Sequence, residues 1–160
     1  MNTTRKIAII AGALFIIADI AVFTGDALFP VPALTGADYL IQLSAHADLL
    51  AAGVLAKIVS AFACVGIAIA MYPIMKRANA GLALGSVIFR TLEAAFYMVG
   101  VVSLLALLKL SQQFAAAGVA DHASLQVIGD SLVSIRLWAA PLLGVFAFCV
   151  GAFIPLLPYL

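Results

Sequence analysis

Charged residues are scarce in this 160-residue sequence. Eight Lys or Arg and seven Asp or Glu make up 9% of the chain, against about 25% in a soluble domain. So few charges cannot coat a water-facing surface of this size, which excludes a soluble globular fold and a disordered tail. The net charge of +1 creates no field that would attract nucleic acid. Because 66% of the residues are hydrophobic, the composition predicts an integral membrane protein.

Cysteine and histidine are also rare, and neither forms a pattern of metal ligands. Cys64 and Cys149 lie in apolar runs without a CxxC pair, so we expect two buried free thiols. His46 and His122 stand beside single acids, whereas a metal needs three or four converging ligands. Nucleotide-binding loops and the hydrolase motifs GxSxG and HExxH are missing. The sequence predicts no metal and no cofactor, and it favours a protein that is not an enzyme.

Four long apolar runs are present, each close to the 20 or so residues that cross a bilayer as a helix. They cover residues 7–23, 49–75, 82–110 and 137–160. A backbone in lipid must satisfy its own hydrogen bonds, and continuous runs exclude alternating barrel strands. The predicted fold class is all-α, an integral membrane four-helix bundle in one transmembrane domain over residues 1–160. The first run resembles a signal peptide, but Asp19 interrupts it and no A-x-A site follows, so we expect a retained helix.

Lys and Arg are distributed unevenly between the connections, and this asymmetry predicts the orientation. Arg5 and Lys6 precede the first run, and Lys76 and Arg77 separate the second run from the third. The connection over residues 24–48 contains neither residue type. The positive-inside rule therefore places the N-terminus in the cytoplasm.

The two outer connections carry apolar patterns at helical spacing. In the first, Leu40, Leu43 and Ala47 share one helical face, and Tyr39 falls on a neighbouring face. In the second, a stripe is formed by Leu125, Ile128, Leu132 and Ile135. We predict that these segments form short helical extensions packed as an outer cap. Helices lying flat on the lipid are the alternative, which the lack of basic residues disfavours.

Three segments resemble a known family of bacterial multi-pass membrane proteins. They read YLIQLSA at 39–45, MYP at 71–73 before the Lys-Arg pair, and FRTLEA at 89–94. The chain resembles the family catalogued as domain of unknown function 4386 (DUF4386) over residues 5–151. The resemblance implies a multi-pass protein of the bacterial cytoplasmic (inner) membrane, and it implies no reaction. Family members usually carry further helices after the fourth run, which leaves a short member or a chain continuing beyond Leu160.

Four ionisable residues lie inside the predicted spans, where one charge costs roughly 2.5–3.5 kcal/mol at the helix centre. Arg90 and Glu93 stand three residues apart on one helix face, which predicts an internally neutralised pair at mid-depth. A binding or proton-handling site and a lipid-snorkelling Arg90 are the alternatives. Asp19 and Lys57 have opposite signs at similar depth, which predicts an ion pair between two helices. Glu93, roughly 10 Å deeper, is a competing partner for Lys57. All four are candidate binding residues of one polar interior.

The start of the fourth run holds two further features. Arg136 followed by Trp138 is typical of an anchor at headgroup level. The alternative places Arg136 in the outer cap, against Asp130 or Asp121. Pro141 removes one backbone donor and is expected to bend the helix.

These patterns favour a non-enzymatic protein whose polar interior packs helices or binds a partner helix, a lipid or a small amphipathic ligand. A transporter- or channel-like subunit acting as an oligomer is the alternative. An intramembrane enzyme acting on a lipid or quinone, with Glu93 as base and Arg90 binding an anion, is the third interpretation. The predicted partners are the lipid bilayer and a second copy or another membrane protein.

Overall fold

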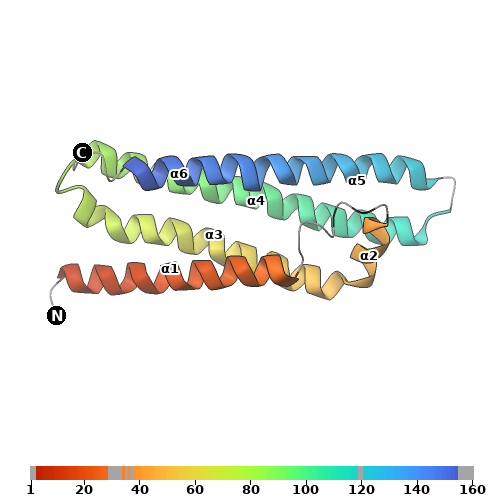
Figure 1. Cartoon of the computed structure of the whole chain (residues 1–160), viewed down its shortest axis with the longest axis horizontal. Coiled ribbons are helices and arrows are strands. Elements are labelled where there is room, and N and C mark those ends of the chain that lie inside the picture. The colour runs from red at the N-terminus through yellow and green to blue at the C-terminus, as the bar shows by residue number, and fades with distance from the viewer. Residues whose placement is uncertain (1–2, 29–33, 35, 37, 119–120, 155–160) are drawn as a thin grey trace.

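Helices account for nearly all of the chain in the computed structural model, which describes residues 3–28, 34, 36, 38–118 and 121–154 (Figure 1). The elements are α1 (Thr3–Leu28), α2 (Tyr39–Ala45), α3 (Ala47–Met75), α4 (Ala80–Ala116), α5 (His122–Leu137), the π-helical turn η3 (Trp138–Gly144) and α6 (Val145–Phe153). The described residues contain no strand, so the predicted all-α class is confirmed.

Four helical segments are long and apolar enough to cross a membrane. They are Thr4–Leu28, Ala47–Met75, Ala80–Ala116 and His122–Phe153, the last combining α5, η3 and α6 into one rod. The third and fourth have 37 and 32 residues, or roughly 55 and 48 Å at 1.5 Å per residue. Both exceed a hydrocarbon core of about 30 Å, so their ends project beyond it, beside α2 (Figure 1). The chain is a multi-pass membrane protein.

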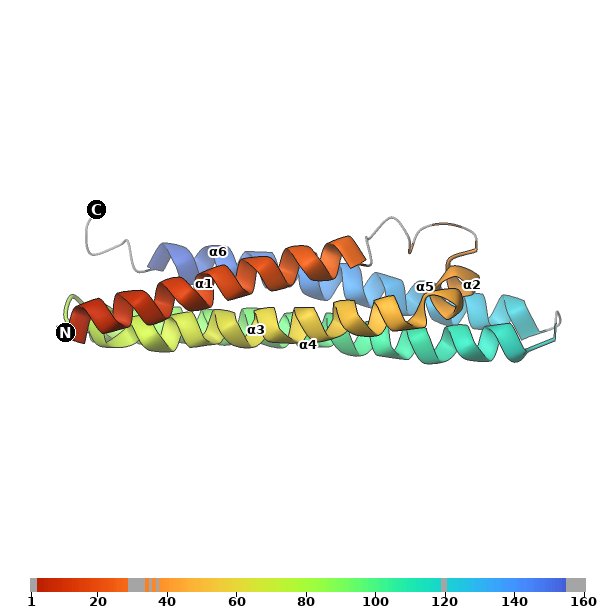
Figure 2. The same cartoon turned by 90° about the horizontal axis from the view of Figure 1, so that it is seen from below.

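The helices pack in chain order. α1 lies along α3, α3 along α4, and α4 along the α5–η3–α6 rod. Figure 2 shows α1 and α6 on one side of the molecule, with α3 and α4 on the other. Extensive contact between α1 and α6 is absent from the described residues. Instead, α1 packs against α3 and α6 packs against α4.

The size of the side chains that pack between the helices changes along the bundle. At the end near α2, side chains from α2, α3, α4 and α5 form the core, including Leu40, Leu50 and Leu107. Between α1 and α3, small residues make the closest contacts. A Cβ added to Gly25 would lie 3.0 Å from the Gly53 carbonyl oxygen. Small residues let helices approach closely in lipid, where burying apolar area provides little driving force between them.

The helix α2 packs against α4 and forms the cap with the projecting helix ends. Leu40 and Leu43 are buried, as their helical spacing predicted. Tyr39, which the helical pattern placed on a neighbouring face, is buried as well: it is 2% exposed and its hydroxyl donates a 3.0 Å hydrogen bond to Asp130. A Cβ on Gly129 would overlap this hydroxyl, so the missing side chain at Gly129 makes room for the contact.

The structure of the α5–η3–α6 rod corrects two predictions about buried residues. The predicted apolar stripe of α5 is shifted, because Ile128 and Ile135 are about half exposed. The buried face carries Gly129, Val133 and Arg136 instead, since close approach to α4 selects a glycine there and Arg136 points inward. Two cysteines are free, but only Cys64 is buried, whereas Cys149 is exposed on the outer side of α6.

Candidate functional site

A cavity of about 260 Å³ lies between α1, α3, α4 and the α5–η3–α6 rod. Its polar lining consists of Asp26, Lys57, Ser60, Tyr97 and Arg136, and the remaining lining is apolar. We name this space the charged cavity. Four helices contribute to it, so only the folded bundle brings these groups together.

Helical spacing explains how each helix supplies its part. Lys57 and Ser60 are three residues apart on one face of α3, and α4 lines the cavity with residues three or four apart from Tyr97 onward. Gly100 lets the rod come close, because a Cβ there would lie 3.0 Å from the Ala140 Cβ. The bend predicted at Pro141 is a π-helical turn, a feature that is frequent at functional sites.

Arg136 is the unusual group in the charged cavity. Only 5% of the residue is exposed, and its Nη1 has no hydrogen-bond partner among the described residues. The predictions that Arg136 is an anchor at headgroup level or pairs with Asp130 or Asp121 are both wrong, because its side chain turns into the bundle. A buried guanidinium nitrogen without an acceptor carries a desolvation cost, so this position favours an anion.

Lys57 donates a hydrogen bond to the Asp26 carboxylate, so the predicted pairing with Asp19 is wrong. The reason is the length of α1, which stays helical to Leu28 and carries Asp26 seven residues, or roughly 10 Å, beyond Asp19. The side chains of Lys57 and Asp26 are 18% and 52% exposed. An ion pair this exposed contributes little to stability.

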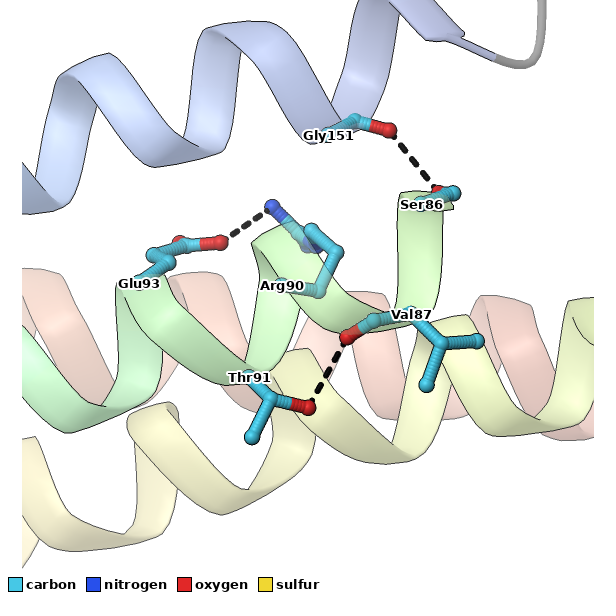
Figure 3. Close-up of polar contacts among 6 residues, drawn as sticks. All are labelled: Ser86, Val87, Arg90, Thr91, Glu93 and Gly151. Atoms are coloured by element: carbon cyan, nitrogen blue, oxygen red, sulfur yellow. Dashed lines mark hydrogen bonds and ion pairs between the residues drawn. The ribbon is translucent and has the colours of Figure 1, made fainter. Parts of the chain in front are cut away.

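Arg90 and Glu93 form the predicted pair on α4, with 2.8 Å between Nη1 and Oε2 (Figure 3). Their side chains are 9% and 2% exposed, so the charges neutralise each other inside the bundle. The Arg90 guanidinium also lies 4.9 Å from the centre of the Phe148 ring on α6. Nearby, the Ser86 hydroxyl donates to the Gly151 carbonyl at 2.8 Å and ties α4 to α6 (Figure 3).

A second cavity, of about 440 Å³, lies near the turn between α3 and α4. α1, α3, α4 and α6 all contribute to its lining, which is mostly apolar and includes Met71 and Leu82. Its polar groups are Asn79, Ser86 and Arg90. We name this space the turn-end cavity.

The four predicted site residues therefore do not share one space. Lys57 lines the charged cavity and Arg90 the turn-end cavity, with Glu93 paired to Arg90. Asp19 is among the lining residues of neither cavity.

Two charged lining residues, Asp26 and Arg136, escaped the sequence reasoning. Asp26 lies just beyond the apolar part of the first helix, where a loop is the natural expectation. One sequence signal could have indicated that Arg136 lies inside the bundle. Pro141 follows it by five residues, and both belong to one helical pattern that starts at His122. No group of three or more His, Cys, Asp or Glu suited to a metal occurs within the described ranges.

Comparison with protein families gives one match to the chain. The model described as Domain of unknown function (DUF4386) matches residues 10–157. No curated protein and no solved structure matches the chain. The match covers nearly the whole helical bundle, and its description names no activity.

Proposed function

The chain belongs to the DUF4386 family, and for this member we propose a non-enzymatic function: the charged cavity binds the anionic headgroup of an amphipathic molecule of the bilayer. The observation that carries the proposal is Arg136, which is buried, lines the cavity and leaves Nη1 without a partner in the described part of the chain. A guanidinium presents parallel donors that match a carboxylate or a phosphate.

The balance of charge in the lining supports an anion. Lys57 and Arg136 are cations and Asp26 is the one acid, so the lining carries one positive charge in excess. The hydroxyls of Ser60 and Tyr97 add two groups that can donate to oxygen atoms. One negative headgroup would balance the charge and give Arg136 the acceptor that it lacks.

The position of the cavity supports a ligand that comes from lipid. α1 and the rod flank the space without extensive contact between them in the described ranges, and Pro141 and Val145 of its lining are exposed. Lys57 lies seven residues, or roughly 10 Å, along α3 from Leu50, which packs in the core near α2. A headgroup at this depth sits below the surface of its leaflet, and its apolar chain leaves between α1 and α6.

We propose that the protein lies in the bacterial cytoplasmic membrane with its N-terminus in the cytoplasm and the cap outside. The supporting observation is that Lys76 and Arg77 lie in the tight turn opposite the cap, at the end where α1 begins (Figure 1). With the native cysteines replaced by alanine, Asp48→Cys should react with an impermeant maleimide in intact cells. Arg77→Cys should react only after permeabilisation, and the reverse pattern would overturn this orientation.

Lipid binding can be tested by native mass spectrometry of the full chain in mild detergent. We expect one bound phosphatidylglycerol and no bound phosphatidylcholine, since only the first has a net negative headgroup. Arg136→Gln should abolish the adduct, Arg136→Lys should retain part of it, and Arg77→Gln is the matched control at an exposed arginine. Equal binding of the two lipids by the unaltered chain would refute the proposal.

Two added probes identify the source of the anion. Binding of palmitate but not phosphatidylglycerol would assign the cavity to a single-chain carboxylate and keep the proposal. Binding of inorganic phosphate as tightly as phosphatidylglycerol would show that no apolar chain is recognised, and the proposal would fail in favour of a soluble anion.

A further inference from the structure

The two cavities lie on the same side of α4 but at different depths. Ser86 lines the turn-end cavity and Gly100 the charged cavity. Gly100 follows Ser86 by 14 residues, or roughly 21 Å of helix. The hydrocarbon core is about 30 Å thick, so each leaflet contributes about 15 Å. Two lining residues roughly 21 Å apart along a spanning helix therefore lie in opposite leaflets.

A row of polar side chains connects the two depths. Ser86, Arg90, Glu93 and Tyr97 follow one another at intervals of three or four residues, which places them on one face of α4. Arg90 lines the turn-end cavity and Tyr97 the charged cavity, and the Glu93 carboxylate has Tyr97 as a neighbour. Counted from Leu82, the Arg90–Glu93 pair lies roughly 12–16 Å into the membrane, close to its midplane.

We propose that the protein moves its anionic amphipathic ligand between the two leaflets along this row, with the Arg90–Glu93 pair as the gate. The inference rests on the proposed binding function, because the charged cavity is the entry site. At the midplane, the headgroup takes the place of the Glu93 carboxylate on the Arg90 guanidinium and then enters the turn-end cavity. The apolar chain stays in lipid between α1 and α6, which do not pack along each other in the described residues.

The resting contacts explain why the pair acts as a gate. Glu93 occupies Nη1 of Arg90 at 2.8 Å, and Phe148 covers the guanidinium on another side. A headgroup without a net negative charge, such as that of phosphatidylcholine, competes less well with a carboxylate for an arginine. An anion crossing the midplane without a basic partner meets the full cost of a charge in lipid, so Arg90 should accelerate its passage greatly.

The test uses the full chain in phosphatidylcholine vesicles that contain a trace of fluorescent phosphatidylglycerol or fluorescent phosphatidylcholine. Dithionite added outside destroys the fluorescence of outer-leaflet lipid only. We expect loss of nearly all phosphatidylglycerol fluorescence and of only the outer half with phosphatidylcholine. Equal rates for the two lipids would overturn the inference, and this comparison needs no variant.

A double variant tests the gate itself. Arg90→Gln with Glu93→Gln removes both charges together, so neither is left unpaired. Transfer of phosphatidylglycerol should fall by roughly a hundredfold, while its binding by native mass spectrometry remains. Thr91→Val is the matched control, because Thr91 points away from α6 and bonds the Val87 carbonyl of its own helix (Figure 3). Unchanged transfer in the double variant would overturn the role of the pair.

The two proposals fail in different ways. If the unaltered chain binds phosphatidylglycerol but leaves the inner leaflet protected from dithionite, transfer is refuted and binding stands. If the chain binds neither phosphatidylglycerol nor palmitate, both proposals are refuted.

Discussion

The Lys57 ammonium group donates a hydrogen bond to the Asp26 carboxylate, and this contact joins α3 to α1 at the edge of the charged cavity. The two helices approach closely at this level, where Gly25 faces Gly53. Asp26 is the more exposed partner, and its carboxylate neutralises the charge of Lys57 at the edge of the cavity. Arg136 is therefore the cation of the cavity that still lacks an acceptor.

Charge reversal tests this pair. Lys57→Glu should lower the free energy of unfolding by about 1 kcal/mol, because an exposed pair is worth about 0.2–1 kcal/mol and repulsion adds to its loss. Combining Lys57→Glu with Asp26→Lys should restore stability, measured by thermal unfolding in detergent. Combining it with Asp19→Lys is the matched control and should restore nothing; recovery there would assign Lys57 to Asp19.

Replacing Arg136 should make the ligand-free chain more stable. Arg136→Met keeps an unbranched side chain and removes a buried charge whose Nη1 has no acceptor, so we expect a gain of about 1–2 kcal/mol. The same variant should lose the rise in unfolding temperature that phosphatidylglycerol produces in the unaltered chain. A less stable variant would mean that Arg136 has a structural role and would argue against the binding site.

Contacts within one helix could be predicted from the sequence. Arg90 and Glu93 are three residues apart, so helical geometry alone brings their side chains together. The partner of Lys57 comes from another helix. Which acid that is depends on how far α1 continues and on the register of α1 against α3. That register follows from the close approach of Gly25 and Gly53, which a single sequence does not display.

Burial of polar side chains was the harder problem. Arg136 was assigned to the membrane interface or the outer cap and Tyr39 was not assigned to the core, yet both residues are at least 95% buried. In each case a glycine makes the room: Gly129 for the Tyr39 hydroxyl and Gly100 for the close approach of the rod beside Arg136. Hydrophobic periodicity cannot detect a buried face built from glycine and polar groups.

Breaking the Arg90–Glu93 pair on one side should be severe. Glu93→Leu leaves the Arg90 guanidinium buried without its carboxylate, and we expect a loss of about 3–5 kcal/mol in unfolding free energy. Adding Arg90→Met should recover most of that loss, because a well-packed apolar pair of similar volume replaces a buried ion pair at little cost. Additive losses in the double variant, measured by denaturant unfolding, would contradict a direct interaction.

Gly129 should tolerate no side chain. Gly129→Ala puts a methyl group onto the Tyr39 hydroxyl, and overpacking of this kind costs about 1–3 kcal/mol. Gly12→Ala is the matched control, since a Cβ there meets nothing within 4 Å. Tyr39→Phe in the Gly129→Ala background should recover part of the loss. If both alanine variants unfold at the same temperature, the close contact in the cap is disproved.

Stability at high pH should depend on Tyr39. Its pKa is raised first by burial and then by the hydrogen bond to the Asp130 carboxylate and its negative charge. Below pH of about 10, the usual tyrosine pKa, the hydroxyl is protonated in both the folded and unfolded chain, so its contribution to stability is complete. Above that pH the unfolded chain loses the proton while the folded chain keeps it, so stability falls as the pH rises towards the folded pKa.

The measurement for this pH effect is the unfolding temperature of the full chain from about pH 8 to 11. Tyr39→Phe has no proton to lose, so its unfolding temperature should decline less above pH of about 10 than that of the unaltered chain. Asp130→Asn should give an intermediate decline, because the side chain stays buried while the carboxylate that holds the proton is gone. Parallel curves for the unaltered chain and Tyr39→Phe would show that the proton on Tyr39 does not stabilise the cap.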